Sequence, residues 1–193
     1  MNYVISEAVP PRGVCRLDII QNVPEAARLQ KGTRQLGRFP ADAYFRMSEN
    51  FPKDIKLADA LSNANNLLVA SERLVELLNS CEALERNDVY EVGILNHKAR
   101  REKAKYFVVH QYGFPKCVDE KKTVGKKSRV NPDEYIALDK LVLNESKIDS
   151  NLALFRPLEY NQRPFFRRDV AEKIAAANIT GIEFFEIDEY DDF

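Results

Sequence analysis

A pattern of a short apolar segment, an amphipathic helix and a second short apolar segment occurs twice in this chain. The first copy consists of Phe45-Arg46, the apolar residues 67–69, a helical run at 71–79 and an extended run at 89–92. The second copy consists of Phe155-Arg156, Phe165-Phe166, a helical run at 169–177 and an extended run at 180–185. This repetition predicts a single fold built from two related strand–helix–strand halves.

The two helical runs match at a constant offset of 96 residues. The matching pairs are Leu74 with Val170, Glu76 with Glu172, and Leu78 with Ile174. Ser71 suits the N-cap of the first helix, because its hydroxyl can accept a hydrogen bond from an unpaired backbone N–H. Each helix carries one apolar stripe, which a single short hairpin cannot cover. We therefore expect both stripes to lie against a common sheet.

The rest of the chain has the pattern of a sheet protein with few helices. Residues 89–95 and 106–112 are rich in β-branched and aromatic types, which predicts a hairpin with a long basic loop at 96–104. Residues 135–143 predict a strand that joins this hairpin in the middle of the sheet. Residues 182–187 are apolar on both faces, which predicts a strand in a central or well-covered position. Residues 55–61 predict a brief amphipathic helix.

Because the hairpin breaks strict strand–helix alternation, the expected class is α+β, with a mixed, mostly antiparallel sheet and a few short helices. A length of 193 residues suits one domain or two tightly joined halves. Residues 1–40 form a loop-rich N-terminal segment with repeated Gly and Pro, in which residues 3–5 can form a strand. Residues 41–193 form one α+β unit, with its halves at about 41–112 and 131–193.

Composition limits the environment of the protein. The three cysteines are far apart and odd in number, which favours reduced thiols in the cytoplasm. The start of the chain lacks the basic and long apolar stretches of a targeting segment, and no stretch is long enough to span a membrane. We expect a cytoplasmic protein without a membrane partner. The formal net charge of −1 does not by itself favour nucleic acid.

The sequence contains none of the common catalytic or phosphate-binding motifs that rely on a glycine-rich loop, a nucleophile elbow or a zinc-binding helix. His97 and His110 lack partners at metal-ligand or triad spacing. Cys117 lies near lysines that can lower a thiol pKa, but no base accompanies it. Cys81 completes an apolar helix face. These observations favour a binding protein without cofactor, metal or enzymatic activity.

Charge is concentrated in two regions. Residues 98–129 hold eleven positive and three negative side chains. This stretch is consistent with solvated loops, with a surface for an acidic protein, or with a nucleic-acid-binding module whose nearby aromatic residues stack on bases. After Gly181 the chain has six acidic residues and no basic one, as in a solvated tail or a docking strip for a basic partner. The candidate partner-binding residues are Lys98, Arg100, Arg101, Glu186, Asp188, Glu189, Asp191 and Asp192.

Seven short segments, in this order and spacing, resemble the immunity-protein family of bacterial polymorphic toxin systems, first described from myxobacterial proteins and long known as a domain of unknown function. The segments are Asp59-Ala60-Leu61, Leu68-Val69-Ala70-Ser71-Glu72-Arg73-Leu74, Val89-Tyr90-Glu91-Val92, Tyr106-Phe107-Val108-Val109, Leu141-Val142-Leu143, Leu154-Phe155-Arg156 and Thr180-Gly181-Ile182-Glu183-Phe184. The resemblance extends over residues 41–188. Arg167-Arg168 replaces a second Ser-Glu pair, and residues 1–40 lie outside the resemblance.

The resemblance implies a non-enzymatic protein, encoded beside a toxin, that neutralises the toxin by binding it. Such toxins are often delivered between cells by type VI or contact-dependent secretion. The family carries no catalytic residues that could be transferred to this chain. A nucleic-acid-associated module using residues 98–129 is the alternative hypothesis. An aromatic-rich sheet edge would also support a homodimer.

Overall fold

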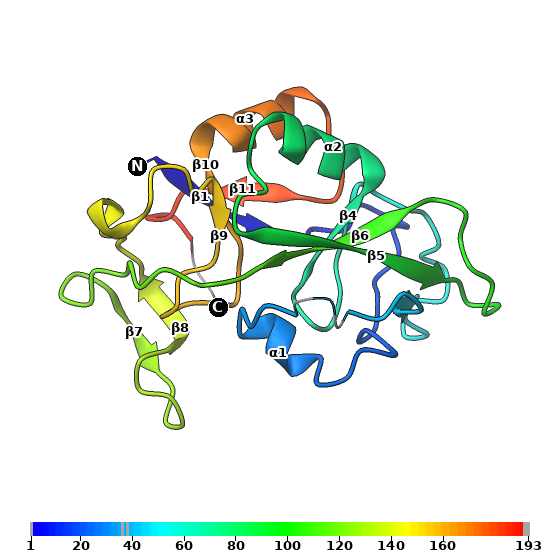
Figure 1. Ribbon diagram of the computed structural model, residues 1–193, viewed down its shortest axis with the longest axis horizontal. Coiled ribbons are helices and arrows are strands. Elements are labelled where there is room, and N and C mark those ends of the chain that lie inside the picture. Colours follow the sequence, from blue (N-terminus) through cyan, green and yellow to red (C-terminus); the bar gives the residue numbers. More distant parts are fainter. Residues whose placement is uncertain (1, 36, 38, 191–193) are drawn as a thin grey trace.

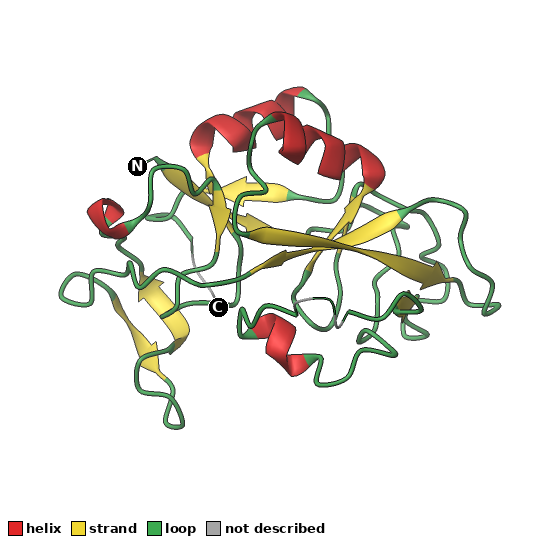
Figure 2. Cartoon of the chain, viewed as in Figure 1, coloured by secondary structure: helices red, strands yellow, loops and turns green. Residues whose placement is uncertain are grey.

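The computed structural model describes residues 2–35, 37 and 39–190 and confirms an α+β, mostly-sheet fold. Within these residues, three α-helices accompany eleven strands in sheets of four, five and two strands. Figure 1 shows helices α2 (Glu72–Ser80) and α3 (Arg168–Ala176) side by side above the strands. Helix α1 (Ala27–Gln30) lies on the opposite side, as Figure 2 shows.

The five-stranded sheet contains the predicted hairpin. Its strands are, in spatial order, β2 (Tyr44–Arg46), β5 (Asn87–Leu95), β6 (Tyr106–Gln111), β4 (Leu68–Ser71) and β3 (Ala60–Leu61). Strands β5 and β6 pair antiparallel, which confirms the hairpin, while β2 pairs parallel to β5. The Ser71 hydroxyl accepts a hydrogen bond from the Leu74 N–H at 3.2 Å, which confirms the predicted N-cap of α2.

The four-stranded sheet is antiparallel throughout. Its strands are, in spatial order, β11 (Glu183–Phe185), β1 (Tyr3–Glu7), β10 (Phe165–Arg167) and β9 (Leu154–Phe155). Strand β1 lies between β10 and β11, so residues near the N-terminus complete a sheet made from the end of the chain. The prediction of a central or well-covered strand at 182–187 is wrong, because β11 lies at the edge of the sheet and its residues are exposed or only half-buried.

The two halves share strand order, strand direction and helix geometry. The series β3-β4-β6-β5 corresponds to β9-β10-β1-β11, and in each half the helix connects two parallel strands that flank an antiparallel one. Both helices end in a left-handed residue at the same offset of 96, Glu82 with φ 54° and Asn178 with φ 52°. The two strand–helix–strand segments therefore share one backbone plan, although the second also needs β1, which lies outside the predicted half at about 131–193.

One proposed equivalence between the halves is wrong. Phe45-Arg46 lies in β2, whereas Phe155 lies in β9, whose structural counterpart is β3. A true equivalence that the sequence pattern did not indicate joins Tyr106 and Tyr3, which pair with Ser71 and Arg167. Both are buried, and their hydroxyls donate to the carbonyls of Ala58 (2.6 Å) and Leu152 (3.4 Å), respectively.

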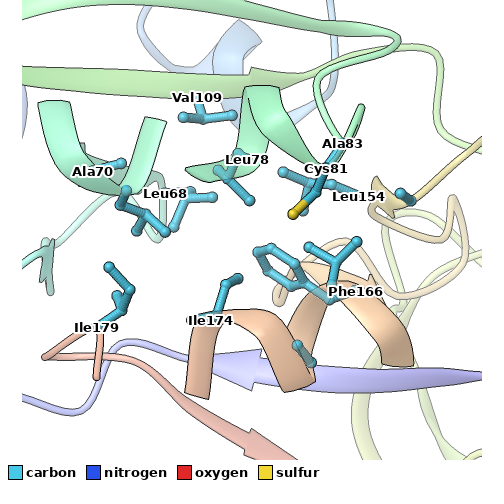
Figure 3. Close-up of a cluster of buried hydrophobic side chains, with 14 of the residues drawn as sticks. Leu68, Ala70, Leu78, Cys81, Ala83, Val109, Leu154, Phe166, Ile174 and Ile179 are labelled. Carbon is cyan, nitrogen blue, oxygen red and sulfur yellow. The ribbon is translucent and has the colours of Figure 1, made fainter. Parts of the chain in front are cut away.

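The two helical stripes share one core. Leu74, Leu78, Val170 and Ile174 are all at most 1% exposed and belong to the same cluster. Figure 3 shows that this cluster also takes Val109 from the five-stranded sheet and Phe166 from the four-stranded sheet. The expectation of a single common sheet is wrong, because the stripes meet between two separate sheets. Ile182 and Phe184 pack at the margin of this core and are only partly buried.

Two further expectations are corrected. Residues 55–61 form no helix, because the backbone of Lys56 bonds to Gly13 and Cys15, and the Ala60 N–H donates to Thr180. Strand β8 (Tyr135–Lys140) pairs with β7 (Val124–Lys127) in a separate two-stranded sheet. Its buried Tyr135 and Leu138 join a cluster on the far face of the four-stranded sheet, near the short 3-10 helix η1 (Glu145–Lys147).

Candidate functional site

The predicted basic loop at 96–104 projects from the end of the β5–β6 hairpin (Figure 1). The Asn96 side-chain oxygen accepts from the N–H groups of Lys98 (3.0 Å) and Arg100 (3.2 Å), which shapes the turn. Lys98, Arg100 and Arg101 are exposed, as expected. Arg101 lies 3.5 Å from Glu91, whereas Lys98 and Arg100 form no ion pair with any described residue. Two cations are therefore available to a partner at this tip.

The basic stretch 98–129 does not form one surface. The 96–104 loop lies at one end of the long axis, and the β7–β8 hairpin lies toward the other (Figure 1). In the second region, three lysines form ion pairs with acidic neighbours: Lys116 with Asp133, Lys122 with Asp119, and Lys127 with Glu120. Tyr106, one of the aromatic residues near the basic stretch that were considered for stacking on bases, is 2% exposed. A continuous path for a nucleic-acid strand along residues 98–129 is therefore not formed.

The acidic candidates differ among themselves. Glu186 is half-buried and accepts two short hydrogen bonds from Arg168, at 2.6 and 2.7 Å, which lower the pKa of its carboxyl. Asp188 and Glu189 are exposed in the turn after β11 and form no ion pair with a described residue. Asp191 and Asp192 lie outside the described residues. The structure thus places Glu186 in an internal ion pair and leaves the next two acidic residues accessible.

The residues considered for catalysis are placed as follows. Burial, and secondarily the charge of Glu159, raise the pKa of the Cys117 thiol to about 12, so this thiol stays protonated at neutral pH. Burial lowers the pKa of His110, and His97 is half-buried in the basic loop. In the described part of the chain, no three His, Cys, Asp or Glu side chains gather in a way that could hold a metal ion.

Sequence reasoning missed a polar junction between the halves, centred on Asp59. The Asp59 carboxylate accepts hydrogen bonds from the hydroxyl of Ser71 (2.9 Å) and from both the N–H and the hydroxyl of Thr180 (3.0 Å each). A Cβ on Gly181, where φ is 81°, would lie 2.2 Å from the Ala60 carbonyl oxygen, so only glycine permits this approach. The junction joins three of the seven segments that carry the family resemblance.

A second junction uses Arg156. This side chain is 3% exposed and donates to the Gln111 side chain (2.9 Å) and to the carbonyls of Asn161 (2.7 Å) and Asn66. No carboxylate among the described residues pairs with it, and burial together with Arg163 lowers its pKa to about 9. It therefore remains charged at neutral pH and links residues of both halves through neutral acceptors.

The comparisons with known proteins show the family of this chain. The model of the family described as Immunity protein 43 matches residues 33–193. The chain belongs to the Immunity protein 43 family. A comparison with curated proteins finds no match. The match confirms the predicted immunity-protein family, while the myxobacterial origin stays a prediction.

In this Immunity protein 43 member, the polar residues of the segments that carry the resemblance have a structural role. Asp59, Ser71, Thr180 and Arg156 hold the halves together, and their side chains engage the fold rather than a ligand surface. Strand β1 precedes the matched region but completes its second sheet. None of the described helices is both long and apolar enough to cross a bilayer.

Proposed function

We propose that this Immunity protein 43 member neutralises a cognate toxin of a polymorphic toxin system by binding it directly, without catalysis, in the cytoplasm of the cell that makes it. Family membership over residues 33–193 is the observation that carries this proposal. We extend the proposal to toxins delivered by type VI or contact-dependent secretion, because the resemblance implies such delivery.

The distribution of charge supports a protein partner. Lys98 and Arg100 lack an ion-pair partner among the described residues, and so do Asp188 and Glu189. The first pair lies at the hairpin tip, and the second pair follows the edge strand β11. Opposite charges on separate surfaces steer encounter and select the correct partner more than they raise affinity. Slow dissociation would then determine how long the toxin stays inhibited.

Co-expression tests the proposed function. The variable C-terminal domain of the large protein encoded beside this gene is expressed in a sensitive cell, with and without this chain. We expect growth only when the chain is present, and a stable complex when the two purified proteins are mixed. Growth arrest in the presence of the folded chain would refute the proposal.

Two charge-reversal variants test which surface of the protein binds the toxin. The double variant Lys98→Glu/Arg100→Glu alters the hairpin tip, and the control Lys121→Glu/Lys126→Glu makes the same charge change on exposed lysines of the opposite end. We expect the first to slow association with the toxin about tenfold or more at low salt and the second to leave it nearly unchanged. Equal effects would show that net charge, rather than the tip, governs binding.

A further inference from the structure

The outer edge of β11 presents an unpaired main chain. The Ser6 N–H donates to Pro164 at 2.9 Å, so the main chain of Ser6 faces β10. Because main-chain groups alternate sides along an antiparallel strand, Ile5 and Glu7 face β11, where they pair with Phe185 and Glu183. The N–H and C=O of Phe184 therefore point away from the sheet. No described residue forms a further strand on this side.

The first half shows how an equivalent edge is covered. Its counterpart of β11 is β5, in which Asp88 and Tyr90 occupy the positions of Glu183 and Phe185. Strand β2 pairs with the far end of β5. Ahead of β2, Arg34 donates to both oxygens of Asp88 at 3.1 Å, and the Phe39 ring stacks on Tyr90 with centroids 4.2 Å apart. An arginine, an aromatic ring and a strand thus cover that edge.

A groove accompanies the open edge in the second half. It lies between α3 and β11 and has a volume of about 380 Å³. Its apolar walls include Ala171 and Ala175 of α3 and Phe184 of β11. Ala175 is exposed and Phe184 is half-buried, so an incoming apolar side chain would find a partly formed site.

The charge near the edge of β11 favours a partner with basic side chains. Glu183 is exposed and forms no ion pair with a described residue, although its counterpart Asp88 binds Arg34. Glu172, Asp188 and Glu189 are also exposed nearby, and the local Arg168 is bonded to Glu186. Acidic side chains therefore dominate this part of the surface. A complementary partner carries a basic residue.

We propose that an extended segment of the cognate toxin adds to the edge of β11, pairing with the Phe184 main chain and placing an arginine or lysine on Glu183 and an apolar side chain in the groove. This proposal rests on the proposed function, because the occupant is the toxin. A second copy of this chain is a poorer occupant. Pairing β11 with its own copy would bring the two acidic surfaces together, and like charges facing each other are destabilising.

Ala175→Trp tests the proposal, because the indole would fill the groove. The matched control is Asn79→Trp, which places the same side chain at the equivalent exposed position of α2. The probe is the purified toxin domain identified by co-expression. We expect the Kd to rise about thirtyfold or more for Ala175→Trp and to stay near the wild-type value for Asn79→Trp. Equal thermal unfolding of both variants confirms that each is folded.

Hydrogen exchange of single amides gives a second readout. In the free protein the Phe184 amide should exchange fast, and in the complex it should be protected about tenfold or more. The amides of Glu183 and Phe185 face β1 and should be protected in both states. A charge reversal, Glu183→Lys, should weaken the complex, and a toxin carrying the opposite reversal should restore it.

The outcomes separate the two proposals. If Ala175→Trp leaves the Kd for the toxin unchanged and the Phe184 amide gains no protection in the complex, strand addition is overturned. The immunity function would stand in that case. A wild-type homodimer that Ala175→Trp dissociates would assign the edge to a second copy and would also overturn it. Failure of the wild-type chain to bind or inhibit the toxin would overturn the immunity function, and strand addition with it.

Discussion

The two halves of this protein have the same backbone plan but different surroundings. Both keep a buried tyrosine bonded to a carbonyl, two apolar helix positions in the shared core, and a left-handed residue after the helix. The first half has its outer strand covered by β2 and the segment before it, whereas the second half leaves β11 at an edge. The repeated features maintain the fold, and the feature that differs is accessible to a partner.

The largest expected effect concerns the shared core. Leu78→Ala and Ile174→Ala should each lower the free energy of unfolding by ~2–5 kcal/mol, because each removes a side chain that is at most 1% exposed. If the halves form one cooperative unit, both variants should shift the single urea unfolding transition. Circular dichroism and fluorescence, followed together, measure this.

Exposed positions on the same helices provide the control. Glu76→Ala and Glu172→Ala lie at matching positions and should change the stability by no more than ~0.5 kcal/mol. Two separate transitions, each sensitive to only one core variant, would show that the halves unfold independently. That result would contradict the shared core.

The helix N-caps give the next effect in size. Ser71→Ala should cost about 1–2 kcal/mol, because it removes the cap on the Leu74 N–H and a donor to Asp59. Arg167, at the matching position, makes no cap hydrogen bond, and its ion pair with Asp169 is largely exposed. Arg167→Ala should therefore cost under about 0.5 kcal/mol. Urea midpoints of the two variants, compared at equal slope, measure the difference.

If Arg167→Ala cost more stability than Ser71→Ala, the stronger N-cap would lie in the second half. It would mean that Asp169, in the first turn of α3, depends on Arg167 for its position near the unpaired N–H groups. The variant Asp169→Asn would then be as destabilising as Arg167→Ala.

The helix C-termini give a smaller effect of opposite sign. Glu82 is exposed and has a φ of 54°, a conformation that disfavours a residue with a Cβ. Glu82→Gly should stabilise the protein by roughly 1 kcal/mol. Asn tolerates this conformation better, so Asn178→Gly should gain roughly half as much or less. Thermal unfolding midpoints measure both, and a loss of stability with Glu82→Gly would contradict this account.

The sequence was sufficient to predict features that depend on neighbouring residues. The repeated helices, the Ser71 cap, the β5–β6 hairpin and the α+β class follow from local periodicity and turn chemistry. It was not sufficient for pairings between distant segments. The insertion of β1 between β10 and β11 joins residues about 160 to 180 positions apart, and no local pattern encodes such a partner. The pairs Phe45-Arg46 and Phe155-Arg156 led to a wrong equivalence between the halves for the same reason, since only the structure shows that β3 corresponds to β9.

For the candidate partner-binding surface, too, the sequence predicted local features but not the arrangement of distant ones. The exposure of Lys98 and Arg100 follows from a polar loop between two strands. The separation of the basic residues into two ends of the molecule does not, because β6 carries the chain across the sheet between them. The Asp59 junction also required the structure, since Asp59 and Thr180 come from different halves.

The last prediction concerns one residue pair of the strand ladder that differs between the halves. Of the predicted effects, it changes the stability least at neutral pH. His110 lies opposite Asp88, whereas the matching Glu7 lies opposite Glu183. Burial lowers the pKa of His110 below its ordinary value of 6.5; nearby Asp88 opposes this shift, and Arg156 adds to it.

Because the unfolded chain binds a proton at this histidine first as the pH falls, the stability should be complete above about pH 7 and should decline as the pH drops below about 6.5. The carboxyls of Asp169 and Glu186 have pKa values lowered from 3.8 and 4.5, so they titrate below this window. Urea unfolding between about pH 8 and about pH 5.5 should therefore show a loss of stability that His110→Gln reduces. A wild-type protein and a His110→Gln variant with the same pH dependence would show that the imidazole is not held neutral in the first half.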